Sequence, residues 1–577
     1  MKKIYFVIIG LIASSTAFAQ SAVDAYRLSQ PDLKGTARYM SMAGAFGALG
    51  GDLSTLSHNP AGIGVYRNSE VGFTLDLDLQ NSESNSAGIK NSIDQTKFLL
   101  NNIGLVMTMK LPSSTCPNLN FGFTYNKSAS FNRRYRGAIG LNGSLSNYIA
   151  NITTEGGYVP GQLLGDEYNG NDPYNPTDPN DAAPWLSILG YDGYLFTNQP
   201  LPSSPDTPNY VGQWGSQTSG IGYFNVQESG TVNSYNIALG GNISNVVFWG
   251  MDFDITHLNY TLTPEWTEDL VNARVGNNDN LISLMNSSWR LSNYYNCSGT
   301  GFNYKLGFIV KPIQEFRLGF AFETPTWYNL TESFYADIDY QYGDNKPGSV
   351  TTNDGYIGTN SMSFRTPWKL NISAAAVLFN RLIISGEYEW AQYKKMKFSN
   401  QSYFGGDYWY PDDYYPWDYP WDYYSMGAYD YNPYISNDPY YYTNKDISEM
   451  YCNTNTLRLG AEFRVTPQFS VRAGYSFVSS PVNSNLKNAP VETAGTIPNY
   501  RLDNTTNYVS CGLGYKFQNF YVDLAYVYKR MDSEYHAYSS WYPSAGDNYN
   551  NLMLIESPKS SLSFNNSQIV LSAGFKF

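Results

Sequence analysis

Hydrophobic and polar residues alternate with a period of two along many short stretches of the chain. In the stretch 457–477, LRLGAEFRVTPQFSVRAGYSF, apolar residues occupy nearly every odd position, and polar, charged or glycine residues occupy nearly every even one. The same alternation occurs at 71–79, 103–109 and 119–125. Successive side chains of a β-strand point to opposite faces, so a period of two is its signature. Each stretch therefore predicts a strand with one apolar and one polar face.

Short turns and long polar segments alternate along the chain. The six short turns lie at 112–118, 244–245, 312–315, 380–381, 466–468 and 518–519. The seven long segments lie at about 81–100, 131–231, 263–300, 341–361, 396–450, 479–506 and 531–563. Together they require fourteen strands, starting near 70, 101, 119, 232, 247, 301, 316, 362, 382, 454, 469, 507, 520 and 565. Short turns on one side and long loops on the other indicate an antiparallel outer-membrane β-barrel.

The strand count depends on the stretch from Phe316 to Tyr340, which can be interpreted as one strand or two. Pro325 lies inside it and cannot donate to a ladder. We interpret it as one bent strand with a bulge near Thr324 and Pro325, which keeps the count at fourteen. A soluble β-sandwich also alternates, but it does not need seven long loops on one side.

The first nineteen residues have the features of a secretory signal peptide. A positive start at Lys2 and Lys3 precedes an apolar stretch and the small-residue site Ala17-Phe18-Ala19. The rest of the chain contains no apolar run near the roughly 20 residues that a membrane helix needs. These features predict export to the outer membrane of a Gram-negative bacterium, where a barrel exposes apolar side chains to lipid.

Composition argues against several classes of function. The formal net charge of -13 argues against a nucleic-acid partner. The chain has four cysteines without a C-x-x-C pair and three histidines far apart in sequence, so we expect no metal site and no cofactor. An isolated histidine provides no activated nucleophile, so we expect no catalytic residues and no enzyme activity.

Residues 20–69 lack the alternation and contain many small residues around Gly44, Gly47 and Gly50. Two interpretations remain open: a flexible lead-in, or a compact periplasmic or lumenal plug. Small residues permit close backbone packing in a confined lumen. We therefore divide the chain into a signal peptide (1–19), a plug (20–69) and a barrel (70–577).

The stretch from Ala43 to Gly51, followed by Asp52 and by Asn59-Pro60-Ala61-Gly62, resembles the plug of the FadL/TodX outer-membrane transport family. The resemblance is closest over about residues 35–66. It implies a fourteen-stranded barrel with a plug motif at Asn59, Pro60, Ala61 and Gly62. It also implies passive uptake of hydrophobic molecules, such as long-chain fatty acids, with sideways exit into outer-membrane lipid at the third strand. That strand loses its alternation at Asn126, Lys127, Ser128, Ala129 and Ser130, which we take as candidates for the lateral opening.

Charged residues fall on the face of the strands that should line the lumen. The cationic candidates for holding a ligand carboxylate are Arg317, Arg458, Lys305, Lys369 and Arg472. The alternative is that these cations pair with acids across the lumen and fix the plug. A charged lining suits a hydrophobic ligand only if the loops and the plug form an apolar pocket.

Two loops, 131–231 and 396–450, are unusually long. The second contains Pro-Trp-Asp-Tyr twice, and its rings supply rigid contact area suited to binding. Trp409, Trp417, Tyr419, Trp421 and Tyr423 are candidate contacts for a protein or glycan partner. Two hypotheses stay open: a channel for hydrophobic compounds, or a non-transporting subunit of an outer-membrane secretion or assembly complex.

Overall fold

The structure is a computed structural model of the chain. It describes residues 21–30, 32–164, 172–176, 182–202, 204–276, 282–400, 440–483, 491, 495–542 and 554–577. The five loop candidates Trp409, Trp417, Tyr419, Trp421 and Tyr423 lie outside these residues. In the described part of the chain, no helix is long and apolar enough to cross a membrane.

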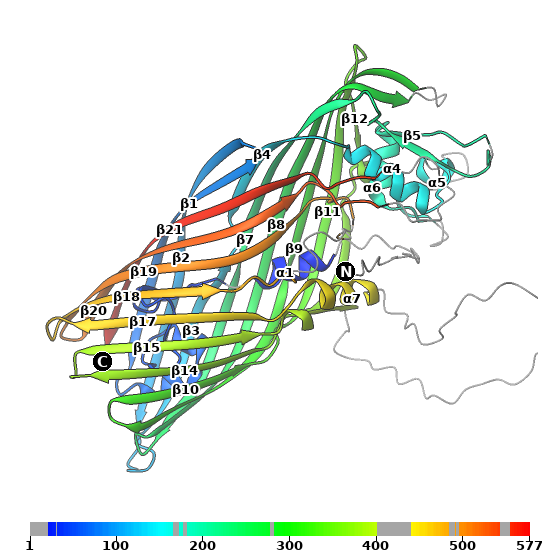
Figure 1. The fold of residues 1–577 in the computed structure, drawn as a ribbon. Coiled ribbons are helices and arrows are strands. Elements are labelled where there is room, and N and C mark those ends of the chain that lie inside the picture. Colours follow the sequence, from blue (N-terminus) through cyan, green and yellow to red (C-terminus); the bar gives the residue numbers. More distant parts are fainter. Residues whose placement is uncertain are drawn as a thin grey trace, which may run out of the picture.

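The described strands form one closed antiparallel barrel (Figure 1). The wall contains β1 (Glu70–Ser86), β2 (Ile89–Lys110), β3 (Asn118–Ser130), β4 (Arg133–Gly140), β7 (Ser219–Ile243), β8 (Val247–Gly276), β9 (Ile282–Ile313), β10 (Phe316–Glu323), β11 (Trp327–Tyr342), β13 (Gly358–Arg365), β14 (Lys369–Leu378), β15 (Leu382–Ala391), β16 (Lys397–Asn400), β17 (Thr454–Arg464), β18 (Phe469–Val478), β19 (Tyr500–Phe517), β20 (Phe520–His536) and β21 (Lys559–Lys576). The last strand, β21, pairs with β1 and closes the wall. Closure leaves no exposed edge between the first and last strands.

Four of the wall strands are interrupted, so that β3 with β4, β10 with β11, β13 with β14, and β15 with β16 each form one strand of the wall. The barrel therefore has fourteen strands, as predicted. The doubtful stretch is one bent strand, because both of its halves pair with β9, at Glu323 with Lys305 and at Trp327 with Phe302. The break contains Pro325, which lacks the N–H that a ladder requires.

Two segments that we predicted as loops are wall instead. Residues 81–100 belong to the β1–β2 hairpin, which pairs up to Ser86 and Ile89. Residues 263–300 belong mostly to β8 and β9, which pair out to Gly276 and Ile282. These hairpins extend well beyond the apolar part of the wall. Their outward faces are polar there, which is why the sequence resembled a loop.

Smaller elements fill the long connections. Between β4 and β7 lie α4 (Leu145–Glu155), α5 (Pro160–Leu164), α6 (Trp185–Asp192) and the two-stranded sheet of β5 (Phe196–Asn198) and β6 (Tyr210–Gly212). Further along lie β12 (Gly348–Thr351), the 3-10 turns η3 (Thr352–Gly355) and η4 (Tyr393–Lys395), and α7 (Tyr441–Met450). These elements gather at the end of the barrel opposite the C-terminus (Figure 1).

The N-terminal segment lies inside the barrel. It contains α1 (Ala22–Ser29), α2 (Ala37–Ser41), α3 (Thr55–His58) and the 3-10 helix η1 (Pro60–Val65). Helix α2 contacts β18, β19, β20 and β21, while η1 contacts β3, β7, β8 and β9. Because these strands belong to different parts of the wall, the segment spans the lumen.

Outward-facing apolar side chains form a belt around the half of the wall that carries the short turns. Its exposed members include Phe123, Ile237, Met251, Leu306, Phe320, Leu459, Leu524 and Leu571. A continuous exposed apolar belt on a closed sheet is suited to lipid rather than to water.

The polarity of the two faces exchanges along β8. In the belt, Met251 and Ile255 face outward while Asp252 and Asp254 face the lumen. Farther from the short turns, Thr261 and Thr263 face outward, and the inward face carries Leu258, Tyr260, Leu262 and Trp266. The strand keeps its alternation, but its surroundings change from lipid outside and polar lumen inside to water outside and a packed core inside.

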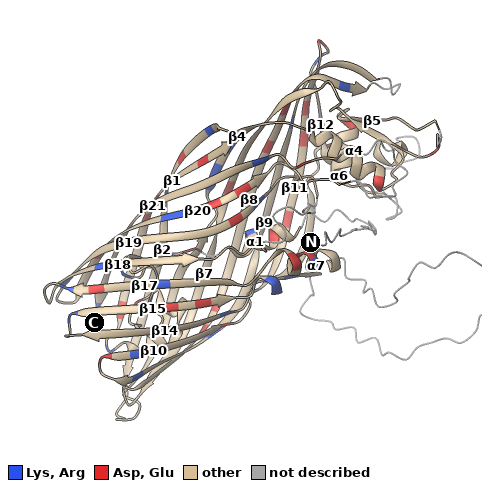
Figure 2. Cartoon of the chain, in the orientation of Figure 1, with Lys and Arg blue, Asp and Glu red and all other residues tan. Residues whose placement is uncertain are grey.

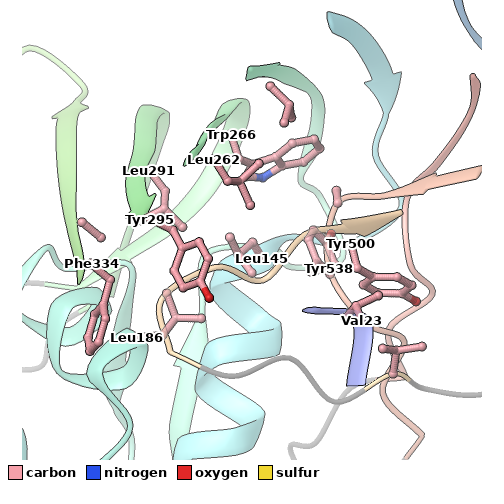
Figure 3. Packing of buried hydrophobic residues seen from close by; sticks show 14 of the residues in the cluster. Val23, Leu145, Leu186, Leu262, Trp266, Leu291, Tyr295, Phe334, Tyr500 and Tyr538 are labelled. Carbon is pink, nitrogen blue, oxygen red and sulfur yellow. The ribbon is translucent and has the colours of Figure 1, made fainter. Parts of the chain in front are cut away.

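The packed core fills the outer half of the lumen. Wall residues such as Trp266 and Tyr295 meet Leu145 of α4, Leu186 of α6 and Val23 of α1 in one buried cluster (Figure 3). It contains many aromatic side chains, and Phe224 stacks on Tyr535 with ring centroids 4.2 Å apart. The lumen thus has an apolar, packed outer half and a polar inner half.

Candidate functional site

Glycines on the inner face of the wall make room for the plug. A side chain on Gly474 would meet Ala43 N at 2.5 Å, and one on Gly319 would meet Gly47 O at 2.5 Å. The same close approach to plug residues occurs on other strands at Gly72, Gly104, Gly122, Gly240, Gly250, Gly307, Gly460 and Gly512. We call these ten residues the glycine belt. Because glycine has no Cβ, the plug packs directly against the wall, through its backbone at Gly250, Gly319 and Gly474 and through side chains such as Leu53 and Leu56 elsewhere.

The Asn59-Pro60-Ala61-Gly62 motif lies at the centre of this packing. Asn59 Nδ2 donates to Gly47 O at 2.6 Å, and Asn59 Oδ1 accepts from Ala61 N at 3.1 Å. The second bond caps η1, whose first residue is Pro60. Proline suits this first helical position because its N–H would be unsatisfied there. The motif therefore closes the plug on itself and seats it against Gly250 and Gly307.

One ion-pair group joins the plug to β15 and β17. His58 Nε2 of the plug lies 2.6 Å from Glu387 Oε1, and Gly47 N donates to Glu387 Oε2 at 2.8 Å. Arg458 Nη1 contacts Glu387 Oε1 at 2.6 Å and Glu389 Oε2 at 3.1 Å. The ligand atoms of His58, Glu387 and Glu389 lie within 4.8 Å of one another, close enough to hold a metal ion. Arg458 already forms an ion pair with each of the two carboxylates, so the geometry favours an ion-pair contact that holds the plug.

A second group joins α2 to β17, β18 and β20. Glu462 accepts from Arg38 Nε of the plug at 2.9 Å and from Arg472 Nε at 2.7 Å. Arg472 Nη1 reaches Asp523 at 2.5 Å. Each charge in this chain has an opposite neighbour, which is the arrangement that makes buried ions tolerable. Figure 2 shows how such charges are distributed over the strands.

Most of the remaining predicted lumen cations form ion pairs with acidic residues of the wall. Lys305 Nζ lies 2.9 Å from Asp254, and Lys369 Nζ lies 3.1 Å from Glu323. Arg317 differs: Nη1 donates to Leu49 O of the plug at 2.8 Å, and Nε is buried without a hydrogen-bond partner. A role of these residues in ligand binding stays a prediction. The contacts are those of the alternative, in which the charges pair and fix the plug.

The ladder between β2 and β3 ends before either neighbouring ladder does. It runs from Lys110 and Asn118 to Asn102 and Asn126 and stops there. From residue 100 to Ile89, β2 pairs only with β1 among the described strands. β4, the continuation of β3, pairs only with β7. We call this interruption of the wall, beyond Asn102 and Asn126, the seam.

The five lateral-opening candidates border this seam. The register between β3 and β7 shifts between Lys127 and Ala129, so Ser128 is an extra residue. Asn126 and Lys127 are both buried although they are consecutive, which shows that the alternation breaks here. A bulge bends its strand and changes its twist. The irregularity thus lies where the sequence predicted it, and its role as an opening stays a prediction.

Comparison with known proteins identifies the family. A family model described as "Outer membrane protein transport protein (OMPP1/FadL/TodX)" matches residues 243–540, more than half of the chain. The chain belongs to this family. No curated protein matches the sequence.

One solved structure, with a TM-score of 0.50, supports the same fold, and a second is similar at a lower score. A crystal structure of a Pseudomonas aeruginosa FadL homologue is similar with a TM-score of 0.50 and 12% identity, covering 95% of this chain and 100% of that chain. The P. putida toluene transporter TodX is similar with a TM-score of 0.46 and 11% identity, covering 95% and 99%. This FadL/TodX-family barrel is accordingly an outer-membrane protein of a Gram-negative bacterium, from a family of channels for hydrophobic compounds rather than of enzymes.

Sequence reasoning missed two features of the site. The signal for the glycine belt is a single glycine at an inward-facing position of a strand whose other residues are mostly large, as at Gly250 and Gly307. The sequence shows only one of the two causes of the seam, the break in the alternation of β3. The other cause, the loss of pairing by β2, depends on the path of β4. That strand crosses the inner side of the β1–β2 hairpin, where Ser84 Oγ donates to Arg136 O at 2.6 Å.

Proposed function

We propose that this protein is a passive channel that takes up hydrophobic small molecules and releases them sideways into the outer membrane through the seam. The observation that carries the proposal is the end of the β2–β3 ladder at Asn102 and Asn126. Where it borders lipid, an interrupted ladder is costly, because lipid cannot satisfy the unpaired backbone groups. The seam starts at this level, near the exposed Phe98. A lateral exit for the transported molecule would explain why the wall is interrupted here.

The position of the seam supports this route. It begins one residue beyond Tyr125, whose ring lies 5.6 Å from that of Tyr235 on β7. Aromatic residues of outer-membrane barrels concentrate at the bilayer interfaces. Below the seam, the lumen is charged and filled by the plug, which disfavours an apolar solute. A hydrophobic molecule that passes the apolar outer half would therefore leave through the wall.

The test removes the irregularity of β3. Deleting Ser128 takes away the extra residue, so β3 can run on in register along β7 and approach β2. We expect uptake of a fluorescent long-chain fatty acid to fall to the background of cells without the channel. The matched control is Ser128→Ala, which keeps the extra residue and loses only its 2.6 Å contact with Ser234. Unchanged uptake in the deletion variant, at equal surface amount, would rule out the lateral route.

The chemical class of the substrate can be tested at the predicted cations. Arg317 is the first choice, because its Nε has no hydrogen-bond partner in the described structure. If a cation holds a carboxylate, Arg317→Gln lowers fatty-acid uptake and leaves the uptake of a neutral aromatic hydrocarbon unchanged. Equal effects on both probes would assign Arg317 to holding the plug through Leu49.

A non-transporting role in a protein complex is the second candidate. It is favoured by the packed outer half of the lumen, where buried aromatic residues such as Tyr260 and Trp289 occupy the place where a ligand would enter. In that case the barrel serves as a rigid scaffold, and purification in mild detergent yields a bound protein. Purification with bound lipid-like molecules and no second protein would support the channel.

A further inference from the structure

Two aspartates of β8 share one ammonium group in the polar half of the lumen. Asp252 and Asp254 occupy consecutive inward positions, and each is 2% exposed. Lys305 of β9 lies directly opposite Asp252 in the ladder. Its Nζ is 2.9 Å from Asp254 Oδ2 and 3.7 Å from Asp252 Oδ2. One positive charge therefore serves two buried carboxylates.

The neighbouring charges leave this imbalance in place. Glu323 of β10 lies opposite Lys305 and forms an ion pair with Lys369 at 3.1 Å. Three carboxylates against two ammonium groups leave one negative charge in excess. Among the described residues, no cation other than Lys305 forms an ion pair with Asp252 or Asp254. A buried charge without a counter-charge is costly, so this group requires a further positive ligand.

The atoms without partners in this group are all oxygens. Asp252 Oδ1, Asp254 Oδ1 and Asn303 Oδ1 are buried and have no hydrogen-bond partner in the described structure. Asn303 is 2% exposed and lies opposite Asp254, to which its Nδ2 donates at 3.3 Å. Carboxylate and amide oxygens, completed by water, are the ligands of hard cations in proteins.

The donors around the two aspartates are arranged as expected for ionised carboxylates, which only accept. Asn236 Nδ2 donates to Asp252 Oδ2 at 2.7 Å, and Asn126 Nδ2 donates to Asn236 Oδ1 at 2.9 Å. Asn102 Nδ2 donates in turn to Asn126 Oδ1. A negative charge on Asp252 thus fixes the direction of three amides, and the last of them belongs to the pair at which the seam begins.

We infer that Asp252, Asp254 and Asn303 bind one alkali-metal cation. The cation is monovalent because the excess negative charge is one. The site lies one inward position beyond Gly250 and Gly307, which seat the plug motif, so a bound cation stabilises the part of the wall that holds the plug. Oxygen ligands from two separate strands form no sequence motif, unlike cysteine and histidine ligands. The inference is independent of the proposed transport route.

The test is thermal unfolding of the full chain in a non-ionic detergent. Sodium chloride replaces N-methylglucamine chloride at constant ionic strength and constant pH, so that only the size of the cation changes. We expect a saturable rise in melting temperature, of about 2 °C at a sodium concentration about tenfold above the dissociation constant.

Two single variants remove the excess charge. Asp252→Asn and Asp254→Asn should each lose the sodium dependence, and in N-methylglucamine each should melt no lower than the parent. Because each variant tests the site separately, a folding failure of one leaves the other, and heat-dependent mobility on a gel verifies folding. The matched control Asp339→Asn changes an aspartate whose side chain is 47% exposed, and it should keep the sodium dependence.

Three results overturn the inference. The first is a parent protein whose melting temperature does not respond to sodium. The second is an equal sodium dependence in both asparagine variants. The third is stabilisation of the parent by lower pH in place of sodium, because a proton would then carry the missing charge. Crystals grown in rubidium chloride locate the cation by its anomalous signal, which should lie between Asp252 and Asp254, and a signal only elsewhere also contradicts the site.

Discussion

Asn102 of β2 and Asn126 of β3 form the last pair of the ladder between their strands, and Asn102 Nδ2 donates to Asn126 Oδ1 at 2.5 Å. Beyond this pair, the N–H and C=O groups of β2 that point away from β1 have no strand partner among the described residues. The pair therefore marks the boundary between sealed and interrupted wall.

Hydrogen exchange should reveal this boundary. We expect roughly half of the amides in 89–100 to exchange quickly, because alternate amides of an edge strand point away from its one partner. The amides of 103–109, which lie between two ladders, should exchange slowly. Mass spectrometry of peptides from the detergent-solubilised protein measures both. Residues 251–262 of β8, paired on both sides, serve as the control, and equal protection of 89–100 and this segment would contradict an open seam.

Filling the glycine belt should displace the plug. In Gly250→Ala the new methyl group would meet Ala61 N at 2.8 Å and come closer still to the carbonyl of Pro60, and backbone cannot move as a side-chain end can. We expect a loss of about 1–3 kcal/mol in the free energy of unfolding, as for other overpacked sites. Thermal unfolding in detergent measures the loss.

The matched control for this change is Gly386→Ala on β15. Its methyl group would have Leu459 Cδ2 as its nearest neighbour, at 3.5 Å, which is an ordinary contact. Its melting temperature should stay near that of the parent. If both variants lose the same stability, the belt has no special role in seating the plug.

The ion pair between the plug and β17 should matter far more than an exposed pair. In Glu462→Gln, Arg38 and Arg472 lose the carboxylate that both contact. Arg472 keeps Asp523, but Arg38, whose side chain is 25% exposed, loses its carboxylate, and leaving a buried charge without its partner costs about 3–5 kcal/mol. Arg290→Gln breaks a pair with Asp339 whose side chains are 50% and 47% exposed, which costs at most about 1 kcal/mol. Denaturant unfolding of both variants measures the difference, and similar losses would show that Glu462 is effectively solvated.

The start of α4 should respond to pH through Glu268. Burial raises the pKa of the Glu268 carboxyl to about 7, well outside the apolar belt. Its oxygens accept from Leu145 N at 2.8 Å and from Trp266 Nε1 at 2.9 Å. Because the folded pKa lies above the unfolded value of 4.5, the stabilisation is complete below about pH 4.5. It is lost as the pH rises through about 7, by at most about 1.4 kcal/mol per pH unit.

Hydrogen exchange of α4, corrected for intrinsic rates, measures this dependence. We expect protection of residues 145–155 to fall between pH 5 and pH 7.5 and to level off above. Glu268→Gln is the control, because its amide stays neutral and can still accept from Leu145 and Trp266 through oxygen. A pH-dependent loss of equal size in the Gln variant would assign the effect to another group.

The alternation predicted most of the wall strands, but several strands are longer than predicted. Strand starts at Val247, Leu382 and Phe520 agree with the structure, because each follows a short turn whose two flanking strands carry the same pattern. The stretch from 81 to 100 was misread because a polar outward face on the water side of the belt looks like a loop in sequence. The cationic candidates were placed correctly in the lumen, but their acidic partners lie on other strands, as for Arg472 and Asp523.

The sequence by itself determined the short turns and which face of each strand points inward, because side-chain alternation is a local property of the backbone. It predicted the number of strands except at 316–340, where pairing with β9 was decisive. Only the tertiary structure decided which residues each face of a strand contacts. Closure of the wall brought Gly250 and Gly307 against one plug motif, and it left β2 without a partner beyond Asn102. Contacts between strands far apart in the chain depend on register and on the path of β4, and no local pattern encodes either.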